Sequence, residues 1–137
     1  MSDERGQGTL ELLLVLGLLA ALLFGALSLG RGYSTRHALD NATAIAARQI
    51  ALEPGAWGDA LKGVGLAVEA SLWGGDASEV SCAVYDAGGA LADPMFLSFG
   101  SRFSVTCSAD FQAAIAFVAT SPRTLTVTHY EVMERYP

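Results

Sequence analysis

The chain has 137 residues and a formal net charge of −6, with 8 lysine and arginine residues against 14 acidic ones. This balance argues against a nucleic-acid-binding protein, because binding a phosphate backbone requires clustered cations. Once an apolar N-terminal segment is set aside, the remaining length suits one small domain with a modest core.

The most informative stretch of the chain runs from Gly6 to Gly30 and reads GQGTLELLLVLGLLAALLFGALSLG. Residues 12–29 contain no charge and only one polar residue, Ser28. At about 1.5 Å per residue, a helix of this length crosses the roughly 30 Å hydrocarbon core of a bilayer. We therefore expect a transmembrane helix over residues 7–30. Glu11 is the only ionisable residue in the stretch, and a carboxylate beside lipid is costly unless it has a function.

Gly6 precedes Glu11 by five positions, and this spacing resembles the class III signal of type IV pilin-like proteins. In that signal a prepilin peptidase cleaves after a glycine, and the fifth residue of the mature chain is a glutamate. The longer N-terminal string resembles the TadE family, the small pseudopilins of tight-adherence (Tad) pili. The residues that carry this resemblance are Arg5-Gly6-Gln7, Glu11, Phe24-Gly25, Gly30-Arg31, Tyr33 and the alanine-rich continuation through Arg48.

The resemblance implies cleavage between Gly6 and Gln7, so that residues 1–6 are a leader and residues 31–137 form an extracytoplasmic domain. It implies a minor pseudopilin or structural subunit of a Tad-type pilus or secretion filament. The precursor would lie in the bacterial inner membrane with its leader in the cytoplasm, and the mature form would lie in the membrane or in the pilus at the cell surface. The implied partners are prepilin peptidase, other pilin subunits, the inner-membrane assembly platform and membrane lipid. Glu11 would then set the register of the assembled helices.

Two alternatives compete with this interpretation. A signal peptide cleaved after the apolar run could use the small residues Ala20-Ala21 or Gly25-Ala26. A signal peptide does not explain the acidic N-terminal region, the length of the apolar run or the position of Glu11. The second alternative is a membrane-anchored binding or sensor domain, in which the helix is only a tether. A tether has no need of a carboxylate at that position, so the spacing favours the pilin-like protein.

Within the apolar run, Gly17, Ala21 and Gly25 recur every four residues. Small residues at this spacing allow a second helix to approach closely, and close packing is a main source of helix association in lipid. Glycine and alanine are also common in membrane helices in general, so the spacing alone has an ordinary explanation. We expect these three residues to form a helix-packing face.

Beyond the apolar run the pattern becomes amphipathic, and we expect one long helix to continue to about Leu52 with a kink at Gly30 and Gly32. One face carries Leu39, Ala42, Ala46 and Ile50, and other faces carry Arg36, Asp40, Thr43 and Ala47. A second helix is expected from Ala56 to Trp73, ended by Gly74-Gly75. Its apolar stripe is Trp57, Leu61, Val64, Val68 and Leu72.

From Glu79 onward the apolar residues alternate with a period of two, which predicts three strands joined by turns. Their inward positions are Val80, Cys82 and Val84, then Phe103, Val105, Cys107, Ala109 and Phe111, then Leu125 and Val127. We expect an α+β fold in which the long N-terminal helix and the second helix pack on a small three-stranded antiparallel sheet. Cys82 and Cys107 both lie on apolar strand faces, so in an extracytoplasmic compartment they are expected to form a disulfide.

No residue constellation in the sequence indicates catalysis, and we expect neither a metal nor a cofactor. His37 and His129 lack a second ligand at metal-binding spacing. His129 and Glu131 share one face of a strand, and we interpret them as a surface pair. Asp86 is not part of a loop of spaced acidic residues like that of an EF-hand.

Overall fold

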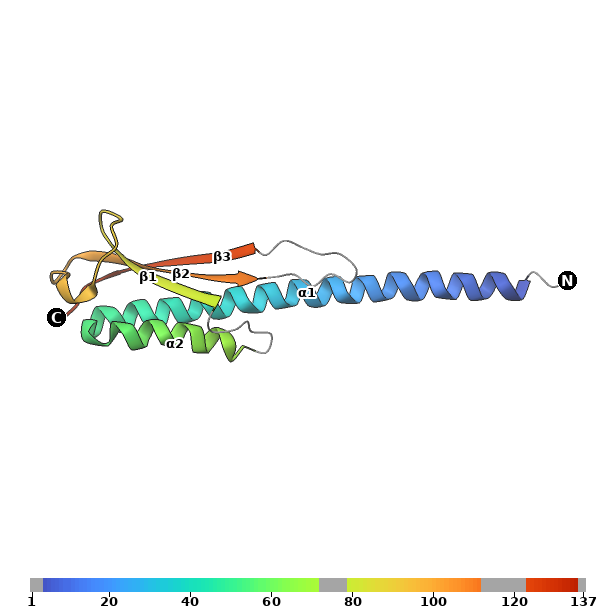
Figure 1. Cartoon of the computed structure of the whole chain (residues 1–137), viewed down its shortest axis with the longest axis horizontal. Coiled ribbons are helices and arrows are strands. Elements are labelled where there is room, and N and C mark those ends of the chain that lie inside the picture. Colours follow the sequence, from blue (N-terminus) through green and yellow to red (C-terminus); the bar gives the residue numbers. More distant parts are fainter. Residues whose placement is uncertain (1–3, 72–78, 112–122, 136–137) are drawn as a thin grey trace.

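The computed structural model describes residues 4–71, 79–111 and 123–135, with side chains described from Gly8 onward apart from that of Phe111. It confirms the α+β fold, in which a long N-terminal helix and a second helix lie against one three-stranded antiparallel sheet (Figure 1). The elements are α1 (Glu4–Leu52), α2 (Trp57–Glu69), β1 (Val80–Asp86), β2 (Arg102–Phe111) and β3 (Arg123–Val132), with short 3₁₀ turns at Pro54–Ala56 and Pro94–Phe96.

Helix α1 contains 49 residues and is therefore roughly 70 Å long. It continues through Gly30 and Gly32 without a break, where the sequence analysis expects a kink (Figure 1). Leucine and alanine dominate its sequence, and their high helix propensity offsets the isolated glycines. The apolar run and the outer half of α1 are therefore one continuous element.

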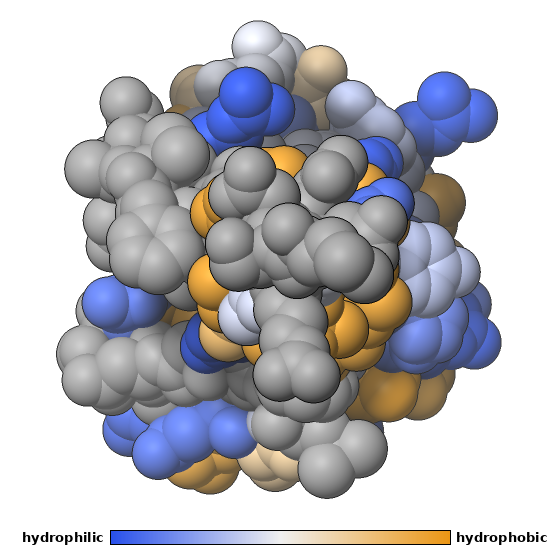
Figure 2. Space-filling view, turned by 90° about the vertical axis from the view of Figure 1, so that its right-hand side faces the viewer, coloured by the Kyte–Doolittle hydropathy of each residue, from blue (hydrophilic) through white to orange (hydrophobic). Residues whose placement is uncertain are grey.

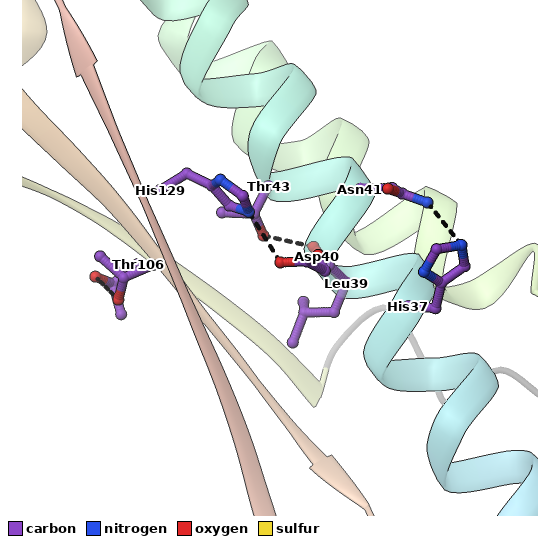
Figure 3. Close-up of polar contacts among 8 residues, drawn as sticks. His37, Leu39, Asp40, Asn41, Thr43, Thr106 and His129 are labelled. Carbon is purple, nitrogen blue, oxygen red and sulfur yellow. Dashed lines mark hydrogen bonds and ion pairs between the residues drawn. The ribbon is translucent and has the colours of Figure 1, made fainter.

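The outer half of α1 is buried over a wider arc than its apolar pattern indicates. Leu39, Ala42, Ala46 and Ile50 are buried as expected, but Thr43 and Ala47 are fully buried as well. The expected placement of Thr43 and Ala47 on other faces was wrong, because α1 packs against both α2 and the sheet. The Thr43 hydroxyl donates a hydrogen bond to the Leu39 carbonyl at 2.6 Å, so its burial leaves no polar atom unsatisfied (Figure 3).

Helix α2 is shorter than the expected span of Ala56 to Trp73. It begins after the Pro54–Ala56 turn and ends at Glu69, while Leu72, Trp73 and the Gly74-Gly75 stop lie outside the described residues. Its buried residues are Ala60, Val64, Gly65 and Val68, with Trp57 and Leu61 packed at the edge of the core.

The sheet has the strand order β1-β2-β3 with antiparallel pairing throughout, so β1 and β3 are its edge strands. Its inner face supplies Val84, Phe103, Val105, Cys107 and Ala109 to the core that it shares with α1 and α2, and Met133, just after β3, joins the same core. Cys82 lies directly opposite Cys107 in the pairing of β1 with β2, and a disulfide joins the two residues.

A row of polar contacts fixes β3 to α1. His129 Nε2 lies 2.9 Å from Asp40 Oδ1 (Figure 3), and the Arg48 guanidinium contacts the carboxylates of Glu131 and Glu134. The hydrogen bond with Glu134 raises the pKa of Arg48 above its usual value, and the negative charge of Glu134 adds to the effect. The expected surface pair of His129 with Glu131 was therefore wrong, since each residue contacts α1 instead. A strand pattern shows which residues share a face but not what lies beneath that face.

Removing the disulfide tests how much it stabilises the domain. The double variant Cys82→Ser, Cys107→Ser opens a loop between residues that are 25 apart in sequence. On chain-entropy grounds this lowers the free energy of unfolding by roughly 3 kcal/mol. Thermal melting of the full chain in detergent, compared with the wild type, measures the effect. Equal melting temperatures, or free thiols in the wild-type protein taken from the cell envelope, would contradict the prediction.

Candidate assembly surface on the N-terminal helix

The first half of α1 projects from the domain as a bare rod (Figure 1). Between Leu10 and Leu29, the large apolar side chains are 42–78% exposed. Seen from the N-terminal end, apolar residues gather around the helix axis and hydrophilic residues lie at the rim of the view (Figure 2). Exposing this much apolar surface to water is strongly unfavourable. The first half of α1 therefore requires lipid or other helices around it.

Among the described residues, α1 is the one helix that is long and apolar enough to cross a membrane. The candidate span is Gly8–Leu52, and its most apolar part lies near the N-terminus. Only 6% of this apolar part is buried against the rest of the chain, so the segment differs from the core helix of a soluble domain.

Glu11 lies near the beginning of this bare segment with its side chain exposed. Within the part of the chain whose side chains are described, it has no hydrogen-bond or ion-pair partner. Toward the domain, the next cation along α1 is Arg31, roughly 30 Å further along the axis. The domain therefore supplies no charge that could compensate this carboxylate in an apolar environment.

Gly6 and Gln7 lie in the first turns of α1, at the end of the helix farthest from the sheet (Figure 1). The domain therefore leaves this end of the helix free for a partner. Their side chains are outside the described set, and the cleavage expected between them stays a prediction.

The small residues Gly17, Ala21 and Gly25 face open space in the single chain. A β-carbon added at Gly17 or Gly25 would meet no atom within 4 Å, and Ala21 is exposed. The structure of one chain therefore leaves their expected role in helix packing as a prediction.

The side of α1 that carries Gly17, Ala21 and Gly25 is also the side that packs in the domain, which was not predicted from the sequence. The residues after Gly25 recur at alternating steps of three and four, which keeps them on one side of a helix. These residues are Ser28, Gly32, Thr35, Leu39, Ala42 and Ala46, and all of them except Gly32 are buried. The side of α1 that the domain covers is thus the side that carries Gly17 and Ala21 in the bare half. The alternating spacing was already visible in the sequence, and following it past Gly25 would have shown this continuity.

The described residues contain no group of three or more histidine, cysteine, aspartate or glutamate side chains that could hold a metal ion. His37 instead stacks against Tyr33, with ring centroids 6.2 Å apart. His129 is engaged with Asp40. The chemically informative feature of the chain is therefore the surface of α1 and not a cluster of reactive groups.

Residues 6–48 match the family model described as TadE-like protein. The match lies entirely within α1 and confirms the resemblance of the N-terminal sequence to that family. It associates the chain with tight-adherence pili and, together with the apolar helix, indicates a membrane-anchored protein. No curated protein and no solved structure gives a significant match to the chain.

Proposed function

We propose that this TadE-like chain is a minor pseudopilin, a structural subunit of a Tad-type pilus or a related secretion filament. In this proposal residues 1–6 are a leader, residues 7–30 span the inner membrane and residues 31–137 form the extracytoplasmic domain. The observation that carries the proposal is the bare apolar half of α1, within the segment that matches the TadE-like family, with Glu11 near its start and no partner for Glu11 among the described side chains.

A simple membrane anchor accounts for less of the structure. An anchor requires about twenty apolar residues and gains nothing from a carboxylate among them. An anchor also has no need for the side of α1 that carries Gly17, Ala21 and Gly25 to remain uncovered. Both features fit a helix that exchanges its contacts with lipid for contacts with other helices.

Glu11 acquires a defined role once the leader is removed. Cleavage after Gly6 places a new α-amine on Gln7, about one turn before Glu11 on the same helix. In a filament, the amine of one subunit can lie beside the carboxylate of its neighbour. Because an unpaired charge in an apolar environment is costly, only the axial step that brings the two groups together is stable. The pair therefore selects the register of neighbouring subunits.

Leader removal is tested with Gly6→Phe expressed with and without prepilin peptidase. The wild type is expected to lose residues 1–6 only when the peptidase is present, and the variant is expected to keep them because the glycine before the scissile bond is gone. Intact mass gives the result. Gly17→Phe is the matched control and should be cleaved normally. A mature N-terminus after Ala21 or Gly25 would instead show a secreted protein and refute the proposal.

The role of Glu11 is tested with Glu11→Gln, which keeps the shape of the side chain and removes its charge. We expect normal cleavage and membrane insertion, with incorporation into pili reduced by at least about tenfold because the neighbour's amine loses its partner. Quantitative blotting of sheared pili against the membrane fraction measures this. Glu69→Gln, an exposed position on α2, is the matched control. Normal incorporation of Glu11→Gln, or conversion of Gln7 to an uncharged pyroglutamate in assembled pili, would refute the register role.

A further inference from the structure

A polar cleft lies where α1 leaves the apolar segment and passes beside the edge of the sheet. Tyr33, Arg36, His37 and Asp40 of α1 line it on one side, and residues 126–128 of β3 line it on the other. Its volume is about 330 Å³, which is large enough for a phosphate group with its ester substituents. We call it the membrane-exit cleft.

The height of the cleft along α1 matches that of lipid headgroups, if residues 7–30 span the membrane as proposed above. The apolar run ends at Leu29, and Tyr33 follows about 6 Å further along the axis. Arg36 lies about 10 Å beyond Leu29, and helical side chains tilt back toward the N-terminus, which here is toward the membrane. The headgroup layer is roughly 5 to 7 Å thick on each side of the hydrocarbon core. The cleft therefore opens at the level of the headgroups.

The α1 wall of the cleft offers a cation and an interfacial aromatic ring. Arg36 is exposed, and Tyr33 is 75% exposed, as is usual for a tyrosine at a membrane surface. The Tyr33 ring stacks on His37, which lies between it and Asn41. Asn41 Nδ2 lies 3.2 Å from His37 Nε2 (Figure 3).

The β3 wall offers main-chain donors. Met133, just after β3, directs its N–H toward β2 to bond the Ser101 carbonyl, and its own carbonyl accepts from Gly100. Because main-chain groups alternate in direction along a strand, those of Thr126 and Thr128 point toward the free edge of β3. The Thr128 hydroxyl lies 2.9 Å from the Thr106 hydroxyl of β2, so Thr126 and Thr128 contribute their main-chain N–H groups where the strand faces the cleft.

Asp40 is the one carboxylate that lines the cleft, and it is engaged. Its Oδ1 contacts His129 Nε2 at 2.9 Å, on the side where α1 meets β3 (Figure 3). The guanidinium of Arg36 therefore remains available for an anion from outside the chain. Arginine binds phosphate oxygens well because its planar group can donate two parallel hydrogen bonds.

The helix surface below the cleft suits an acyl chain. Leu22 and Leu29 lie on the same side of α1 as Tyr33, at helical spacing, and they are 66% and 78% exposed. A free phosphate ion would gain nothing from this apolar surface, whereas a phospholipid would use both parts. We propose that the membrane-exit cleft binds the phosphate of an anionic phospholipid in the outer leaflet of the inner membrane, with Arg36 as its principal ligand.

The test uses the full chain, purified in detergent and offered equal amounts of phosphatidylglycerol and phosphatidylcholine, with bound lipid counted by native mass spectrometry. The wild type is expected to retain phosphatidylglycerol preferentially. Arg36→Gln is expected to lower that preference about fivefold, the usual effect of one arginine near an anionic surface. Arg102→Gln, an exposed position at the far end of the sheet, removes the same charge and should leave the preference unchanged.

Three results would overturn the proposal: an unchanged preference in Arg36→Gln, an equal loss in Arg102→Gln, or complete displacement of the lipid by inorganic phosphate. Carbonate extraction and peptidase cleavage of the wild type, measured in parallel, separate this proposal from the previous one. A chain that is cleaved and anchored but has no headgroup preference refutes only the cleft. A chain that washes out of the membrane refutes both.

Discussion

The structure depends on one unbroken helix whose two halves have different surroundings. The outer half of α1 is the central element of the domain, because α2 and the sheet both pack on it and bury even Thr43. The first half has no such cover among the described residues, although its side chains are more apolar. Since the helix is continuous, the domain cannot fold back to shield the apolar half. Lipid or other subunits must do so.

Side-chain contacts also hold the sheet to the outer half of α1. His129 with Asp40, and Arg48 with Glu131 and Glu134, hold β3 against α1 at separate points along the helix. Such exposed pairs are individually worth little in stability, but they fix the orientation of the sheet about the helix axis. A register selected at Glu11 within the membrane would thus be transmitted to the position of the domain outside it.

The sequence predicted the features that depend on local pattern. The apolar run of α1, the alternation of the three strands and the apolar-face positions of Cys82 and Cys107 all follow from spacing along the chain. Contacts between distant segments were not accessible in this way. Thr43 and Ala47 are buried because two elements pack on one helix, and a helical pattern does not show how many partners it has. The partners of His129 and Glu131 lie on α1, some ninety residues earlier, and nothing in β3 itself identifies them.

We propose that the open side of α1, which carries Gly17 and Ala21, receives a helix of another subunit. Photo-crosslinking in assembled pili tests it most directly, with benzoylphenylalanine placed at Ala21 or, on the opposite side of the helix, at Leu23. Crosslinks are expected from Ala21 to the N-terminal helix of a pilus subunit, with markedly fewer from Leu23. Lipid adducts alone from Ala21, or equal protein crosslinks from both positions, would contradict it.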